Sequence, residues 1–223
     1  MKRKIIVGVP LLVLGLVGLM GVLHLPFMRP VAMPLMAALG YDCPVRASPE
    51  EVEVARMASA RAARGDAPSP ARPALGFVLD RTSRAEVDAW AAAHGVSCTA
   101  SQRGTVLRCT GVPAAAVGLS GGAIDDLSFA FDPASATLVT VTALRNQLDA
   151  ATAAATLGER RTSLAAELGE GQAHGQATAL YLAAAPMRTA LVEYRFSDYI
   201  ANLSATNLGA RVAVREHYMS AVD

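Results

Sequence analysis

Residues 124–144, IDDLSFAFDPASATLVTVTAL, are the stretch that decides the fold class of this chain. Leu127, Phe129 and Phe131 alternate with small or polar residues, and this two-residue period is typical of a strand with one buried face. An Asp-Pro turn separates this strand from a second one, TLVTVTAL, at the end of the stretch. The stretch therefore predicts two neighbouring strands of an antiparallel sheet.

A hairpin is predicted just before these strands, in residues 95–112, GVSCTASQRGTVLRCTGV. With Arg103 and Gly104 at the tip, residues whose numbers sum to 207 face each other, and Cys98 and Cys109 are such a pair. Directly opposed Cα atoms in an antiparallel ladder lie about 4.5–5.5 Å apart, which is within disulfide range. The register therefore predicts a disulfide between these two cysteines. The alternative is a three-residue loop at the tip, which would shift the register so that the cysteines no longer face each other.

A metal site is the alternative interpretation of these cysteines. His94 lies four residues before Cys98, but no second histidine or CxxC pair accompanies it in the sequence. We therefore expect no metal and no other cofactor. The third cysteine, Cys43, is left over, and its role stays open.

Two helices are predicted to precede groups of strands. The first runs from Arg84 to His94, because Ser83 and Glu86 form a capping box and Gly95 ends the apolar pattern. The second covers residues 145–168, where leucine and alanine recur at three- and four-residue spacing. Further strands are predicted at residues 75–80, 189–197, 198–206 and 210–218.

Helix followed by antiparallel strands thus occurs twice, once after Ser83 and once after Arg145. We expect an α+β fold in residues 75–223, with an antiparallel sheet packed against helices. The pattern is compatible with a duplicated helix–strand–strand–strand unit, whose copies would be residues 75–144 and 145–223.

An apolar run, residues 5–25, precedes this domain and reads IIVGVPLLVLGLVGLMGVLHL. A helix of this length spans roughly 31 Å, about the thickness of the bilayer hydrocarbon. The alternative, a cleaved signal peptide, would have a shorter apolar run and a small-x-small site soon after it. The positive charges in residues 1–4 predict a cytoplasmic N-terminus, and an Ala- and Arg-rich composition favours a bacterial host. We therefore expect a single-pass inner-membrane protein with a periplasmic C-terminal domain.

Three segments are predicted between this membrane helix and the domain. Residues 26–47 form a membrane-proximal segment rich in methionine and proline. Residues 48–65 form a helix opened by a capping box, and residues 66–74 form a stiff, proline-rich linker. The predicted membrane helix has one face of small residues, Gly8, Gly15, Gly18 and Gly21. Such a face would let another helix approach closely. The alternative is that these residues only reflect how common glycine is in membrane helices.

A basic cluster on the last strand is the candidate docking face for an acidic partner. Arg211, Arg215 and His217 alternate along the strand and share its outer face, and Arg195 of a neighbouring strand could join them. The alternative is a solvated sheet face on which these residues pair with Glu193 and Glu216.

The net charge of +1 argues against nucleic acid as a partner. Ser120, His174 and Asp125 are the residues that a hydrolase would have to use, but their flanking residues match no catalytic motif. We therefore expect a non-catalytic accessory or structural subunit of a larger membrane or envelope complex, with other membrane or periplasmic proteins as partners. The alternative is a membrane-tethered module that binds a ligand or the cell wall.

Overall fold

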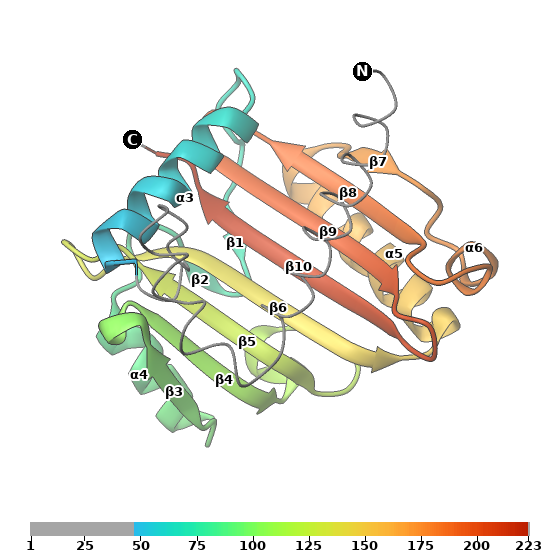
Figure 1. Ribbon diagram of the computed structural model, residues 1–223, viewed down its shortest axis with the longest axis horizontal. Helices are drawn as coiled ribbons and strands as arrows, with labels where there is room; N and C mark the ends of the chain where they lie inside the picture. Colours follow the sequence, from blue (N-terminus) through green and yellow to red (C-terminus); the bar gives the residue numbers. More distant parts are fainter. Residues whose placement is uncertain (1–46, 223) are drawn as a thin grey trace, which may run out of the picture. The chain divides into compact units, whose positions relative to one another are not determined.

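An eight-stranded antiparallel sheet with the order β3-β4-β5-β6-β10-β9-β8-β7 forms the centre of the fold (Figure 1). The computed structural model describes residues 47–222, and Ser48–Asp223 make up one compact unit. The strands of the sheet are β3 (Cys98–Ser101), β4 (Val106–Val112), β5 (Ile124–Phe131), β6 (Leu138–Leu148), β7 (Gln172–His174), β8 (Thr189–Arg195), β9 (Tyr199–Asn207) and β10 (Val212–Ser220). The predicted α+β class with an antiparallel sheet is confirmed.

Four α-helices accompany the sheet in the described part of the chain: α3 (Pro49–Ala63), α4 (Arg84–Ala93), α5 (Ala150–Leu168) and α6 (Ala179–Ala183). The two predicted capping boxes are both present, at the start of α3 and of α4. Two short 3₁₀ turns, η3 (Gln102–Gly104) and η4 (Ala114–Val117), and a small hairpin of β1 (Pro73–Ala74) and β2 (Phe77–Val78) complete the elements.

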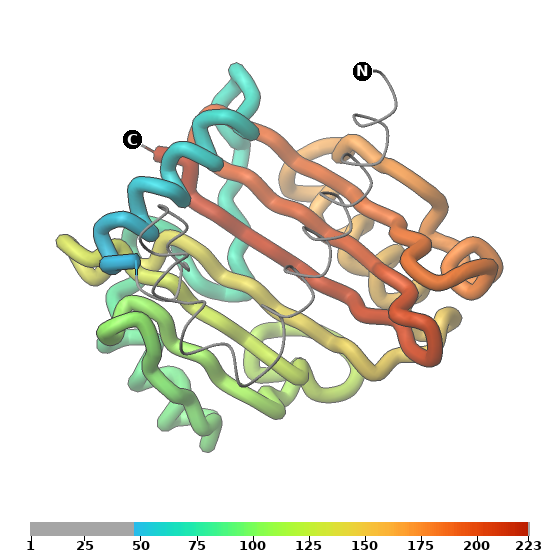
Figure 2. Tube along the Cα trace, in the orientation of Figure 1, coloured from blue at the N-terminus to red at the C-terminus, as the bar shows by residue number. Residues whose placement is uncertain are grey.

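The two halves of the sheet have the same topology. In each, one helix precedes four antiparallel strands that pair in chain order: α4 precedes β3 to β6, and α5 precedes β7 to β10 (Figure 2). The last strands of the halves, β6 and β10, pair with each other at the centre of the sheet. Each half therefore contains four strands rather than the three of the predicted repeat unit, because β7 joins the three strands predicted in the second half.

Helices α4 and α5 cover the same face of the sheet, and this face forms the main core (Figure 1). Phe129 of β5 is fully buried, and Trp90 of α4 meets it edge to face with ring centroids 5.8 Å apart. The indole nitrogen of Trp90 donates a hydrogen bond to the Ala116 carbonyl oxygen at 3.1 Å. The α5 side chains Leu157 and Leu164 are buried in the same core. Each buried leucine contributes about 2 kcal/mol.

Two predicted element boundaries differ from the structure. Residues 75–80 do not form one strand, because Leu75 and Asp80 have positive φ angles and the segment turns back on itself. The predicted helix over residues 145–168 begins at Ala150, since β6 continues to Leu148 and the Asp149 carboxylate caps the first turn of α5.

Helix α3 lies on the opposite face of the sheet, across one end of β9 and β10 (Figure 1). Ala60 of α3 packs against Ile200 and Ala221, and an Arg56 Nη1 group donates to the Ser220 carbonyl oxygen at 2.6 Å. The predicted linker, residues 66–74, runs beside the β8–β9 turn, where the backbone N–H of Ser69 donates to the Asp198 carboxylate at 2.8 Å.

The predicted membrane helix at residues 5–25, its glycine face and Cys43 lie outside the described residues. Within residues 47–222, none of the helices is long and apolar enough to cross a bilayer.

Candidate functional site: the second face of the sheet

The face of the sheet opposite α4 and α5, here called the second face, carries the side chains that alternate with the core residues. In β9, for example, Asn202 and Ser204 are half-buried on this face, whereas Ala201 and Leu203 are buried on the core face. Among residues 47–222, α3 is the helix that packs there, and it covers only one end of β9 and β10 (Figure 1).

A single row of polar residues crosses all eight strands on the second face. The strand register places one residue of each strand directly opposite the next, and we call this set the polar row: Thr99, Arg108, Ser128, Thr142, His217, Asn202, Glu193 and Gln172. Antiparallel sheets commonly keep one face packed and one face polar. Here the polar face offers hydroxyl, amide, imidazole and charged groups in one line across the whole sheet.

Ion pairs stand at both ends of the polar row. Arg108 of β4 pairs with Asp126 of β5, and this arginine is 66% exposed. On the far side, Glu193 of β8 accepts from Arg195 at 2.8 Å and lies 3.3 Å from the His174 imidazole. The centre of the row, by contrast, consists of neutral groups.

His217 occupies the centre of the polar row. Its Nδ1 lies 2.8 Å from the Thr142 hydroxyl and 3.4 Å from a guanidinium nitrogen of Arg215. Because a guanidinium only donates, Nδ1 accepts and the neutral ring carries its proton on Nε2. Burial, reinforced by the Arg215 charge, lowers the pKa of His217 to about 4. The imidazole is therefore neutral at physiological pH, and it adds no positive charge to the second face.

The residues of the predicted docking cluster occupy three places. Arg215 and His217 share the second face of β10, and the Arg215 side chain is exposed. Arg195 lies at the end of β8, bound to Glu193. Arg211 precedes β10 and lines a separate cavity instead.

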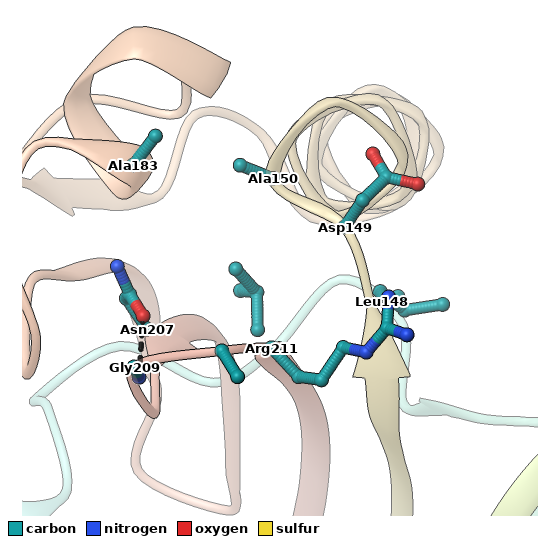
Figure 3. Close-up of a pocket in the computed structure, with 9 residues that line it drawn as sticks. Leu148, Asp149, Ala150, Ala183, Asn207, Gly209 and Arg211 are labelled. Carbon is teal, nitrogen blue, oxygen red and sulfur yellow. Dashed lines mark hydrogen bonds between the residues drawn. The ribbon is translucent and has the colours of Figure 1, made fainter.

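That cavity has a volume of about 200 Å³ and lies between the start of α5 and the β9–β10 turn (Figure 3). Asn207 is its buried polar residue, and its amide donates to the carbonyl oxygens of Leu182 at 2.7 Å and Ala185 at 3.1 Å. The amide oxygen accepts from the Gly209 N–H at 2.6 Å. These bonds use the polar groups of Asn207 to join α6 to the turn, so the residue has a structural role.

A second cavity, of about 390 Å³, lies beside α3, and half of its lining residues are charged. Arg56 in its wall binds Glu53 at 2.6 Å, and Asp132 accepts hydrogen bonds from the backbone and hydroxyl of Ser135. Asp80 pairs with Arg72. These contacts engage Glu53, Arg56, Asp80 and Asp132 within the fold itself.

The three residues that a hydrolase would use lie at separate sites. The Ser120 hydroxyl donates to the Glu159 carboxylate of α5 at 2.6 Å. His174 is on the edge strand β7 and lies beside Glu193 of β8. Asp125 accepts a hydrogen bond from the backbone N–H of Asn146 at 2.5 Å. The structure thus does not bring these side chains together.

A buried ionic cluster on the core side was not predicted. Glu216 of β10 is 2% exposed and accepts from Arg160 Nε of α5 at 2.8 Å and from the Tyr218 hydroxyl at 2.5 Å. Burial, together with the neighbouring Glu216 charge, raises the pKa of Tyr218. Glu216 therefore does not pair with basic residues on the outer face. The sequence did contain a signal for this burial. Inward and outward residues alternate along the strand, and Glu216 falls in the same alternate positions as the inward residues Val212 and Val214.

The predicted disulfide is present: Cys98 and Cys109 are directly opposed in the β3–β4 ladder and bonded to each other. Among residues 47–222, no group of three or more histidine, cysteine, aspartate or glutamate side chains is arranged to hold a metal ion. No family model, curated protein or solved structure matches this chain.

Proposed function

We propose that this protein is a non-catalytic, membrane-anchored periplasmic subunit of a larger bacterial membrane or envelope complex. We further propose that it binds a partner protein through the second face of its sheet. The observation that supports this role most is the polar row, in which every strand contributes a hydrogen-bonding side chain to one continuous line.

The small size of the central side chains supports close contact with a partner. Ser128 and Thr142 stand on one side of His217, and Asn202 and Ser204 stand on the other. Short side chains let a partner surface approach the sheet, and they lose little conformational entropy when they become ordered.

Asn202 has a side-chain acceptor that the described residues leave unsatisfied. Its side-chain oxygen is buried, and among the described residues it accepts no hydrogen bond. A buried acceptor without a donor costs about 1–3 kcal/mol, and this cost would be removed where partner binding turns the Asn202 side chain toward a donor. The neutral His217 ring opposite Asn202 adds no charge to the centre of the face.

Co-purification of the full-length protein from mild-detergent membranes tests the proposal. We expect stoichiometric membrane or periplasmic proteins in the eluate, and we expect Leu replacements of Gly15, Gly18 and Gly21 to reduce their amount. A protein that elutes as a clean monomer from native membranes would contradict the subunit role. It would favour instead a tethered module that binds a ligand or the cell wall.

A further inference from the structure

Three exposed large apolar residues belong to α6, to the segment before β8 and to the β9–β10 turn, and these elements lie at the same end of the sheet (Figure 1). Leu180 of α6 is 84% exposed, Met187 before β8 is 72% exposed, and Leu208 in the β9–β10 turn is 56% exposed. We call these three residues the apolar corner. Of the other large apolar residues that are exposed among residues 47–222, Val54 lies on α3, at the opposite end of the sheet.

Hydrogen bonds hold the three segments of the apolar corner together. The Met187 N–H donates to the Asn207 carbonyl oxygen at 2.7 Å, which places Met187 beside the turn that contains Leu208. The Asn207 amide in turn donates to the Leu182 and Ala185 carbonyl oxygens at the end of α6. The corner is therefore a fixed feature of the fold.

Met187 occupies a backbone position that favours glycine. The Arg188 N–H donates to the Ala185 carbonyl oxygen, and Met187 is the third residue of this turn, with a φ of 62°. A positive φ at that position suits glycine and strains a bulky side chain. Because the Met187 side chain is largely exposed, its contacts within the domain do not offset the strain. The Met187 side chain therefore gains little from contacts within the domain.

The charges around the apolar corner are positive. Residues 174–188 and 207–211 contain Arg188 and Arg211 but no aspartate or glutamate. Arg188 lies over the Tyr181 ring, 4.9 Å from its centroid. The carboxylate in the adjoining cavity wall, Asp149, is engaged with the first N–H groups of α5 (Figure 3).

We propose that the apolar corner inserts into the headgroup region of an anionic phospholipid bilayer, the membrane that holds the predicted N-terminal anchor. Leu180, Met187 and Leu208 would enter the acyl boundary, while Arg188 and Arg211 bind lipid phosphates. Protruding side chains on turns fit a deformable lipid surface, and the arginines match its negative charge. The proposal is independent of the partner that binds the second face.

Fluorescence of the full chain in liposomes tests this contact. In a Cys43→Ser background, a nitrobenzoxadiazole label is attached to Leu180→Cys, and the matched control carries it on Val54→Cys. The liposomes contain phosphatidylcholine alone or mixed with phosphatidylglycerol, with doxyl-labelled lipid as the quencher. We expect the label at position 180 to be quenched several-fold more strongly than the label at 54, and only in the anionic membranes.

Met187→Gly separates loss of membrane contact from loss of folding. Glycine relieves the turn, so this variant should unfold at a higher temperature than the parent, yet quenching of the label at position 180 should fall. Arg188→Glu combined with Arg211→Glu should abolish the quenching. Equal quenching at 180 and 54, no quenching at 180, or quenching that appears only when a membrane protein extract is added would each overturn the proposal.

Discussion

Arg160 of α5 and Glu216 of β10 form an ion pair in the core, with Nε and Oε2 2.8 Å apart. Tyr218 closes the cluster, because its hydroxyl donates to the same carboxylate oxygen and accepts from Arg160 Nη2 at 3.0 Å. A buried charge is tolerated only where it is paired and hydrogen-bonded. The cluster therefore fixes α5 on β10, the strand of the second half that lies at the centre of the sheet.

Removing one partner of this pair should destabilise the domain strongly. In Arg160→Met, the Glu216 charge stays buried without its counter-ion, and we expect a loss of about 3–5 kcal/mol in the free energy of unfolding. The double variant Arg160→Met with Glu216→Gln should recover a large part of this loss. Urea unfolding followed by circular dichroism measures both. Equal stability of the Arg160 single variant and the parent would show that the pair lacks this role.

His217 should make the stability of the domain depend on pH. Its pKa is about 4 in the folded protein and near 6.5 in the unfolded chain, so the unfolded state binds more protons between these values. Stability should therefore fall as the pH drops from about 6.5 to 4, by at most about 3 kcal/mol. Unfolding at a series of pH values compares the parent with His217→Gln, which should lack this component. Parallel pH profiles of the two proteins would argue against it.

The disulfide should stabilise the edge of the first half. It closes a short loop between Cys98 and Cys109, and in the chain-entropy description a loop of this size is worth about 3 kcal/mol. Cys98→Ser combined with Cys109→Ser should lower the midpoint of urea unfolding accordingly. A reducing agent should have the same effect on the parent and none on the double variant. An unchanged urea midpoint of the reduced parent would mean that the disulfide does not contribute to the stability of the domain.

Gly65 should be required for the position of α3. A β-carbon there would lie 2.3 Å from the Arg195 carbonyl oxygen, so the chain after α3 would have to move away from β8. We expect Gly65→Ala to cost about 1–3 kcal/mol in thermal or urea unfolding. Gly122→Ala is the matched control, because its β-carbon meets nothing within 4 Å, and it should stay within about 0.5 kcal/mol of the parent. Equal effects of the two substitutions would contradict this close approach.

Local features of the sequence predicted much of the fold. The register that pairs Cys98 with Cys109 follows from hairpin arithmetic, and the start of α4 follows from the Ser83–Glu86 capping box. Strand β7 was missed because its three residues, Gln172–His174, are all exposed and show no alternation. The reversal of the chain at Leu75 was missed because a leucine in the sequence does not indicate a positive φ angle.

The candidate site could be predicted only in part. The sequence placed Arg215 and His217 on one face of the last strand, because that relation is local to the strand. The polar row is not local, because each strand contributes one residue and the line exists only after the seven registers between the eight strands are set. The low pKa of His217 likewise depends on its burial in the folded protein and on the Arg215 charge.

The most direct test of the central claim is partner retention by Ser204→Glu in the full-length protein, purified from mild-detergent membranes. Ser204 lies on the second face, and Ala166→Glu on the exposed side of α5 is the matched control, because it adds the same charge away from that face. We expect Ser204→Glu to lose most of its co-purifying protein, whereas Ala166→Glu keeps it. Both variants should have the same unfolding midpoint as the parent. Full retention of partners by Ser204→Glu would contradict the assignment of the second face as the binding surface.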